Sequence, residues 1–124
     1  MYARILIVDD NALIRNLVRR SLESVGWQIC GEACNGQEAV DKAQQLHPNF
    51  IVLDLSMPVM NGLEAAKILL RLMPSVSLIM FTSFITEHLK REALSNGIKK
   101  VIAKEDSIAN LLDAVRSLAG QNAA

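Results

Sequence analysis

The sequence predicts an α/β fold, a five-stranded doubly wound parallel sheet with strand order 2-1-3-4-5 and five helices. Short apolar runs alternate along the chain with segments whose apolar residues recur at helical spacing. The runs are continuously apolar, which is typical of strands buried on both faces of a parallel sheet. Five β/α units in a row favour right-handed crossovers with helices on both faces. The order 2-1-3-4-5 is the better known arrangement at this size.

Five strands are predicted from the apolar runs. Four of these runs are uniformly apolar and stop at a polar residue, as expected for strands in the middle of a buried sheet. The second run is less uniformly apolar, which favours a place at the edge of the sheet. The predicted strands cover residues 5–8, 27–33, 51–53, 78–81 and 101–103.

A helix is predicted after each strand. Gly26 and Gly97 end the first and fourth helices, and Pro74 stops the third. Asn35 followed by Glu38 resembles a capping box at the start of the second helix. The fourth helix has the thinnest apolar face of the five. The apolar repeats of these helices span residues 13–22, 39–46, 63–73, 89–94 and 108–118.

The composition fits one globular domain. Hydrophobic residues make up 51% of the 124 residues, and the mean hydropathy is +0.24. We expect residues 1–119 to form the domain and residues 120–124 to be a short tail. Thirteen basic residues balance thirteen acidic ones, which gives no reason to expect binding to nucleic acid or to a membrane surface. No secretion signal is present and no apolar run approaches about 18 residues, so the chain is predicted to be cytoplasmic.

Polar residues suited to phosphoryl chemistry follow four of the buried strands. Asp9 and Asp10 follow the first strand, Asp54 the third, Thr82 the fourth and Lys104 the fifth. Ligands of open α/β sheets bind outside the carboxyl ends of the strands, so we expect these five side chains to gather at one edge. Each alone could be structural, such as an acidic residue near a helix N-terminus. All five in these places by chance is improbable.

Asp54 is the centre of this predicted site. A carboxylate at the end of a hydrophobic strand can act as a nucleophile toward phosphorus. Three neighbouring carboxylates repel one another unless a cation neutralises them, and Mg²⁺ suits oxygen ligands of this kind. Lys104 would supply a positive charge for phosphoryl oxygens, and Thr82 would supply a hydroxyl donor.

The chain resembles the response regulator receiver domain of bacterial two-component signalling. Residues 54–62 match the pattern D-x-x-M-P-x-M-x-G at every fixed position, and the acidic pair, Thr82 and Lys104 also match. The resemblance implies a flavodoxin-like fold in which Asp54 accepts a phosphoryl group from a sensor histidine kinase or a phosphotransfer protein. It also implies that Asp10, Asp54 and the backbone carbonyl of Ser56 bind Mg²⁺, with Asp9 assisting through water.

Two further features bear on the partners of the chain. Residues 31–33 and 35–39 look like the subfamily of receivers that usually precedes a helix-turn-helix DNA-binding domain. The resemblance therefore implies either a single-domain regulator or an output domain outside this chain. A second copy of the chain is a further candidate partner.

The sequence departs from the family pattern at two positions. Glu105 follows the lysine where many receivers have proline, and a cis peptide bond before glutamate would cost about 2.5–4 kcal/mol. Val101 stands where many relatives carry a tyrosine or phenylalanine that turns inward upon phosphorylation. Valine is too short and too stiff at χ1 to act as that ring does.

Two other functions compete with a receiver domain. A small phosphohydrolase with an aspartate nucleophile would need a second aspartate where this chain has Ser56, and a cap over its substrate. An interaction module that works without phosphorylation is favoured only by Val101, whereas the intact acidic site argues against it. We therefore expect a phosphoacceptor domain rather than an enzyme acting on a separate substrate.

Overall fold

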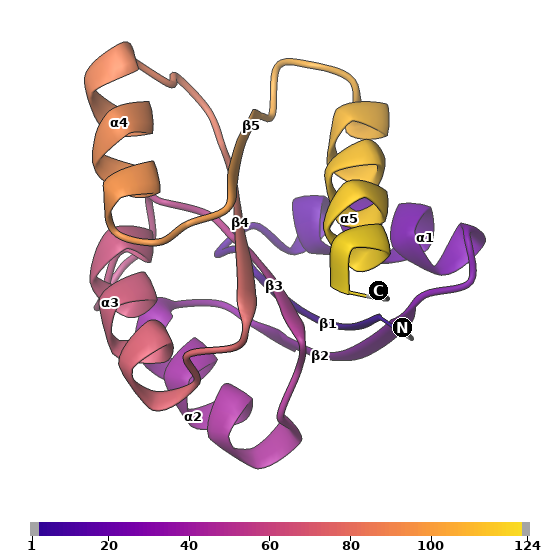
Figure 1. Cartoon of the computed structure of the whole chain (residues 1–124), viewed down its shortest axis with the longest axis horizontal. Coiled ribbons are helices and arrows are strands. Elements are labelled where there is room, and N and C mark those ends of the chain that lie inside the picture. Colours follow the sequence, from indigo (N-terminus) through magenta and orange to yellow (C-terminus); the bar gives the residue numbers. More distant parts are fainter. Residues whose placement is uncertain (1–2, 123–124) are drawn as a thin grey trace.

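In the computed structural model, which describes residues 3–122, strands and helices alternate along the whole described chain (Figure 1). Each predicted strand is found to within one residue at either end. The strands are β1 (Arg4–Val8), β2 (Gln28–Ala33), β3 (Phe50–Leu53), β4 (Ser77–Thr82) and β5 (Lys100–Ala103). The helices are α1 (Ala12–Ser24), α2 (Gly36–Leu46), α3 (Gly62–Leu72), α4 (Glu87–Ser95) and α5 (Ile108–Asn122).

The strands form one parallel sheet in the order β2-β1-β3-β4-β5, which confirms the predicted topology. The less apolar strand β2 lies at the edge, as its composition indicated. Helix α5 continues to Asn122, and thus into the predicted tail of residues 120–124. The last two residues of that tail lie outside the described part of the chain. No helix within residues 3–122 is both long enough and apolar enough to cross a membrane.

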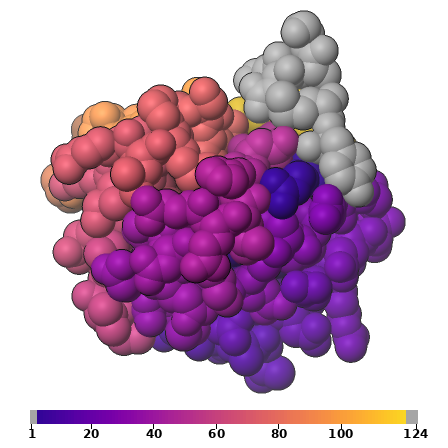
Figure 2. Space-filling model, turned by 90° about the horizontal axis from the view of Figure 1, so that it is seen from below, coloured from indigo at the N-terminus to yellow at the C-terminus, as the bar shows by residue number. Residues whose placement is uncertain are grey.

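The helices cover the two faces of the sheet in separate groups. Helices α1 and α5 lie on one face, and α2, α3 and α4 lie on the other (Figure 1). Seen from below, the N-terminal half of the chain covers most of the visible surface, with α3 and α4 at one side (Figure 2). The chain therefore has the three-layer arrangement that a doubly wound sheet requires.

Alternate residues of the central strands fill two apolar layers. Successive strand residues point to opposite faces, so every residue of a strand covered on both sides must be apolar. This explains the uninterrupted runs in β1, β3 and β4. The layer under α1 and α5 includes Ile5, Ile7, Phe50, Val52, Ile79 and Phe81. The layer under the other three helices includes Leu6, Val8, Ile51, Leu53, Leu78 and Met80.

The capping box predicted for α2 is only half formed. Asn35 caps the helix by accepting the Glu38 N–H at 2.8 Å. The Glu38 carboxylate does not return to the Asn35 backbone, because it accepts the Cys34 N–H at 3.3 Å and pairs with Lys42 at 3.2 Å. A complete capping box is found at α3 instead, between Asn61 and Glu64.

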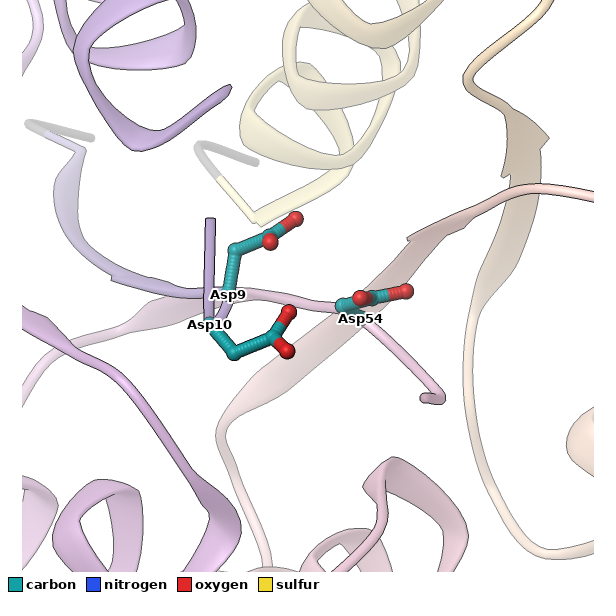
Figure 3. A group of neighbouring side chains, drawn as sticks. All are labelled: Asp9, Asp10 and Asp54. Atoms are coloured by element: carbon teal, nitrogen blue, oxygen red, sulfur yellow. The ribbon is translucent and has the colours of Figure 1, made fainter. Parts of the chain in front are cut away.

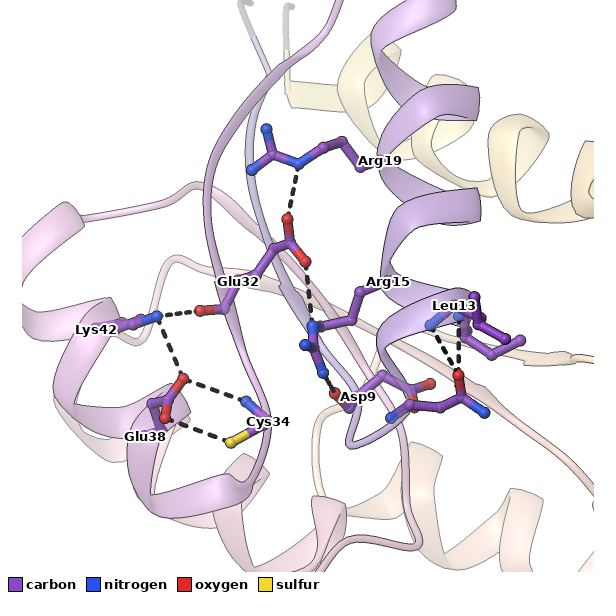
Figure 4. A network of polar contacts seen from close by, with 10 residues as sticks. Asp9, Leu13, Arg15, Arg19, Glu32, Cys34, Glu38 and Lys42 are labelled. Carbon is purple, nitrogen blue, oxygen red and sulfur yellow. Dashed lines mark hydrogen bonds and ion pairs between the residues drawn. The ribbon is translucent and has the colours of Figure 1, made fainter.

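A network of charged side chains joins α1, β2 and α2 around the edge strand (Figure 4). The Glu32 carboxylate accepts from Arg15 Nε at 3.1 Å and from Arg19 Nε at 2.8 Å, both on α1. On the opposite side, Lys42 of α2 donates to the Glu32 backbone carbonyl. Charged side chains over an edge strand hinder its pairing with another chain. Glu32 thus adds polar contacts between β2 and both layers of helices, through its carboxylate to α1 and through its backbone carbonyl to α2.

We expect Glu32→Ala to lower the free energy of unfolding by about 1 kcal/mol, since two charge-assisted hydrogen bonds are lost at a partly exposed site. The loss should be smaller at high salt, because salt screens such pairs. Asp113→Ala is the matched control, since it removes one exposed pair with Arg116 at 3.2 Å. Urea unfolding at low and high salt measures both effects. Equal losses in the two variants would contradict the role given to Glu32.

Candidate functional site

The six candidate residues lie together at the carboxyl edge of the sheet. They line a cavity of about 340 Å³ formed where β1, β3, β4 and β5 end. The predicted gathering of side chains from four strands is thus what the parallel topology produces. The lining comprises Asp9, Asp10, Asn11, Asp54, Ser56, Thr82, Ser83, Phe84 and Lys104.

Three carboxylates meet in this cavity (Figure 3). One oxygen from each of Asp9, Asp10 and Asp54 lies within 4.8 Å of the other two. Asp9 and Asp54 are only 3% and 5% exposed, whereas Asp10 is exposed. The Asp54 N–H donates to the Val8 carbonyl at 3.0 Å, which joins the ends of β3 and β1 and sets the carboxylates side by side.

The Lys104 ammonium neutralises part of this negative charge. It lies 2.6 Å from Asp9 Oδ2 and 3.3 Å from Asp54 Oδ2. Burial alone would lower the pKa of Lys104, but the hydrogen bond to Asp9 and the charges of Asp54 and Asp9 together raise it. Lys104 therefore stays charged and bridges the two buried carboxylates.

The ionised form of Asp9 remains unfavourable although Lys104 lies beside it. Burial raises the pKa of Asp9, and the nearby charge of Asp54 adds to the rise. The bond from Lys104 and the Asn11 N–H, which donates to Asp9 Oδ1 at 2.9 Å, offset the rise only in part. One ammonium thus leaves net negative charge on a cluster of hard oxygen donors. That donor set fits a divalent cation such as Mg²⁺.

The loop after β3 passes directly against the backbone of Asp54. The Gly62 N–H donates to the Leu55 carbonyl at 2.9 Å, and a Cβ on Gly62 would lie 2.2 Å from the Asp54 carbonyl oxygen. Only glycine fits so close an approach. In the same loop Val59 is 81% exposed with φ of 71°, a conformation that β-branched residues rarely adopt. The loop that begins at Asp54 is therefore tightly constrained at its helix end.

Thr82 is the last residue of β4 and is buried. Its carbonyl accepts the Lys104 N–H at 2.9 Å, which extends the pairing of β4 and β5 to the edge of the cavity. Thr82 and Lys104 are therefore neighbours across two adjacent strands as well as members of the same site.

One contact beside the site was not expected from the sequence. The Glu105 carboxylate accepts the backbone N–H of Phe84 at 3.1 Å, and this bond lowers the pKa of Glu105. Glu105 stood out in the sequence only because it replaces proline. Within residues 3–122 no peptide bond is cis, including that between Lys104 and Glu105. Val101, the other departure, is partly buried against the apolar layer under α2, α3 and α4.

The sequence and the structure both match known proteins. A family model for the response regulator receiver domain matches residues 5–116. A protein-glutamate methylesterase/protein-glutamine glutaminase of Methanosarcina acetivorans is 46% identical over 107 residues. That match covers 84% of this chain but only 30% of the relative, so the chain spans less than a third of that protein.

Two further matches cover nearly all of both proteins. The chemotaxis protein CheY of Thermotoga maritima is 32% identical over 118 residues, which is 95% of this chain and 98% of the relative. The crystal structure of a CheX-CheY-BeF₃-Mg complex from Borrelia burgdorferi contains a chain that superimposes with a TM-score of 0.90 at 28% identity. This match covers 94% of the present chain and 88% of the other.

We expect Asp9→Asn to stabilise the protein in metal-free buffer. The raised pKa of Asp9 means that the native state holds a proton on this group more tightly than the unfolded chain does. Ionised Asp9 therefore weakens the native state at neutral pH, and its contribution to stability improves as pH falls through its pKa. Asparagine imitates the protonated form, so the advantage of the variant should shrink in acid.

Urea unfolding with a chelator, and then with added Mg²⁺, measures this effect. The variant should gain less stability from Mg²⁺ than the wild type, because a more weakly bound ion stabilises the native state less. Asp106→Asn removes an exposed carboxylate nearby and should change neither value. A less stable Asp9→Asn variant in the absence of metal would show that the pair with Lys104 outweighs the cost of burial.

Proposed function

Because the chain belongs to the response regulator receiver domain family, we propose that Asp54 is its phosphoacceptor. The observation that carries this proposal is the place of Asp54. Its carboxylate is buried at the end of β3, lines the cavity, and lies 3.3 Å from the Lys104 ammonium. The donor is a phosphohistidine of a sensor histidine kinase or of a phosphotransfer protein.

The transfer forms one bond and breaks another. A carboxylate oxygen of Asp54 attacks the phosphorus, and the bond between phosphorus and the donor nitrogen breaks, with its electron pair left on the nitrogen. The product is an acyl phosphate on Asp54. Since phosphoryl transfer passes through a loose transition state, the protein contributes mainly position and charge. Asp54 is suited to this attack because its backbone is fixed by the pairing with β1 and by Gly62, and its carboxylate is held 3.3 Å from the Lys104 ammonium.

Lys104 and Thr82 act on the transferred group. Lys104 holds Asp9 and Asp54 before transfer, and a phosphoryl oxygen then replaces a carboxylate as its partner. Thr82 lies across from Lys104 and offers a hydroxyl donor to a second phosphoryl oxygen. Both residues stand at strand ends, so neither needs to be brought in from a distant part of the chain.

Mg²⁺ is the proposed cofactor. Asp10, Asp54 and the backbone carbonyl of Ser56 would hold it, with Asp9 assisting through water, and all four residues line the cavity. When bound, the ion neutralises the charge that collects on the carboxylates and the phosphoryl oxygens. The exposed position of Asp10 makes it the member of the cluster that an incoming ion can reach first.

The proposed domain catalyses only its own phosphorylation and dephosphorylation. A phosphohydrolase of the aspartate type needs a cap over its substrate, and no insertion between the elements of residues 3–122 covers the cavity. The methylesterase relative is longer than this chain, so its activity says nothing of the present domain. The cytoplasmic location, a DNA-binding output domain and self-association remain predictions.

We expect wild-type protein to gain one phosphoryl group from acetyl phosphate when Mg²⁺ is present, and Asp54→Asn to gain none. Intact-mass measurement followed by peptide mapping tests this. Asp113→Asn, which changes an exposed aspartate on α5, is the control and should be labelled as wild type. An adduct that persists in Asp54→Asn, or that forms equally well with Mg²⁺ chelated, would reject the assignment.

We expect Lys104→Ala to bind Mg²⁺ as tightly as wild type or up to about fivefold more tightly, because a positive charge leaves the cluster. Its rate of phosphorylation should nevertheless fall by about tenfold or more, since a donor to the phosphoryl oxygens is lost. Lys100→Ala, at the opposite end of β5, is the control. Metal titration and mass-detected kinetics separate the two effects, and an unchanged rate would remove Lys104 from the mechanism.

A further inference from the structure

Two consecutive bonds join the loop after β4 to the loop after β5. The first runs from the Lys104 N–H to the Thr82 carbonyl at 2.9 Å. The second runs from the Phe84 N–H to Glu105 Oε2 at 3.1 Å, so a side-chain carboxylate continues the pairing where the strands have ended. The second bond thus lies two residues beyond Thr82 on one side and one residue beyond Lys104 on the other. Both loops begin with a residue of the phosphoacceptor cavity.

The backbone of Phe84 adopts a conformation that is unfavourable for phenylalanine. Its φ of 57° lies in the left-handed region, where residues other than glycine are uncommon. The residue is 86% exposed, so burial of its side chain does not hold the backbone in place. The hydrogen bond from the Phe84 N–H to the Glu105 carboxylate stabilises this conformation. Phe84 lines the cavity, so the conformation it adopts shapes the mouth of the site.

We propose that Glu105 is a positioning residue of the phosphoacceptor site. By accepting the Phe84 N–H it makes the loops after β4 and β5 one unit, so that Thr82 and Lys104 face the phosphoryl group together. This inference rests on the proposed function of Asp54. The residue acts through two others and does not itself touch the transferred group.

The chemistry of Glu105 fits this role and that of its neighbour does not. The Phe84 N–H, which donates to Glu105 Oε2 at 3.1 Å, is also the main cause that lowers the pKa of Glu105, so its carboxylate faces the loop after β4. Asp106 instead contributes its backbone N–H to the Ala103 carbonyl at 3.1 Å. A proline or an alanine at position 105 has no side-chain oxygen and would leave the Phe84 N–H to water.

The test compares Glu105→Ala, Glu105→Gln and Asp106→Ala with wild type. The maximal rate of Asp54 phosphorylation by acetyl phosphate should fall by about fivefold in Glu105→Ala, because misplacing two donors raises the barrier. Glu105→Gln keeps an oxygen acceptor and should lie within about twofold of wild type. Asp106→Ala should behave as wild type. Mg²⁺ affinity should be the same in all four proteins.

Amide hydrogen exchange tests the contact itself without phosphorylation. The Phe84 N–H should exchange about fivefold faster in Glu105→Ala than in wild type, and Glu105→Gln should restore protection. An unchanged maximal rate in Glu105→Ala, a Glu105→Gln variant as slow as Glu105→Ala, or unchanged exchange at Phe84 would each overturn the proposal. A wild-type protein that takes no label on Asp54 would instead overturn the proposed function, and the positioning role with it.

Discussion

The contact between the Lys104 ammonium and the carboxylates of Asp9 and Asp54 is the interaction on which the site depends. Three carboxylates crowd the end of a sheet whose central strands are largely apolar, and two of them are buried. Lys104 reaches them from the edge strand β5, so its charge links the edge of the sheet to its centre. Burial still raises the pKa of Asp9 although Lys104 lies beside it. One ammonium facing three carboxylates leaves a set of hard oxygen donors that fits a divalent cation.

The topology explains why these groups can meet at all. Parallel strands all end at the same edge, and the order β2-β1-β3-β4-β5 places the acidic strands β1 and β3 side by side. Two backbone hydrogen bonds then fix the register of neighbouring strand ends. One runs from the Asp54 N–H to the Val8 carbonyl, and the other from the Lys104 N–H to the Thr82 carbonyl. The reactive side chains thus stand on rigid backbone, which suits chemistry that relies on position.

The strand-end residues could be predicted because their signal is local. An apolar run that stops at Asp54 or Lys104 predicts both a buried strand and a polar side chain at the end of that strand. The bond between Phe84 and Glu105 could not be predicted, because it joins residues 21 apart and requires a left-handed phenylalanine. The half-formed capping box at Asn35 has a different cause, because Lys42 and Cys34, each four residues from Glu38, are alternative local partners for its carboxylate. Sequence patterns thus identified the strand ends, but they did not decide between competing local partners and did not reveal a contact between distant residues.

The two helices beside the site, α3 and α4, differ in how closely they are packed. Helix α3 begins at Gly62, and its backbone packs so closely against the Asp54 carbonyl that no Cβ would fit between them. On the other side, α4 buries only Ala93 among its nine residues, and few contacts oppose its displacement. Displacement of α4 is therefore opposed by fewer buried side chains than displacement of α3, which buries Gly62, Ala65, Ala66 and Leu69. We expect the structural response to a phosphoryl group on Asp54 to be larger in α4 than in α3.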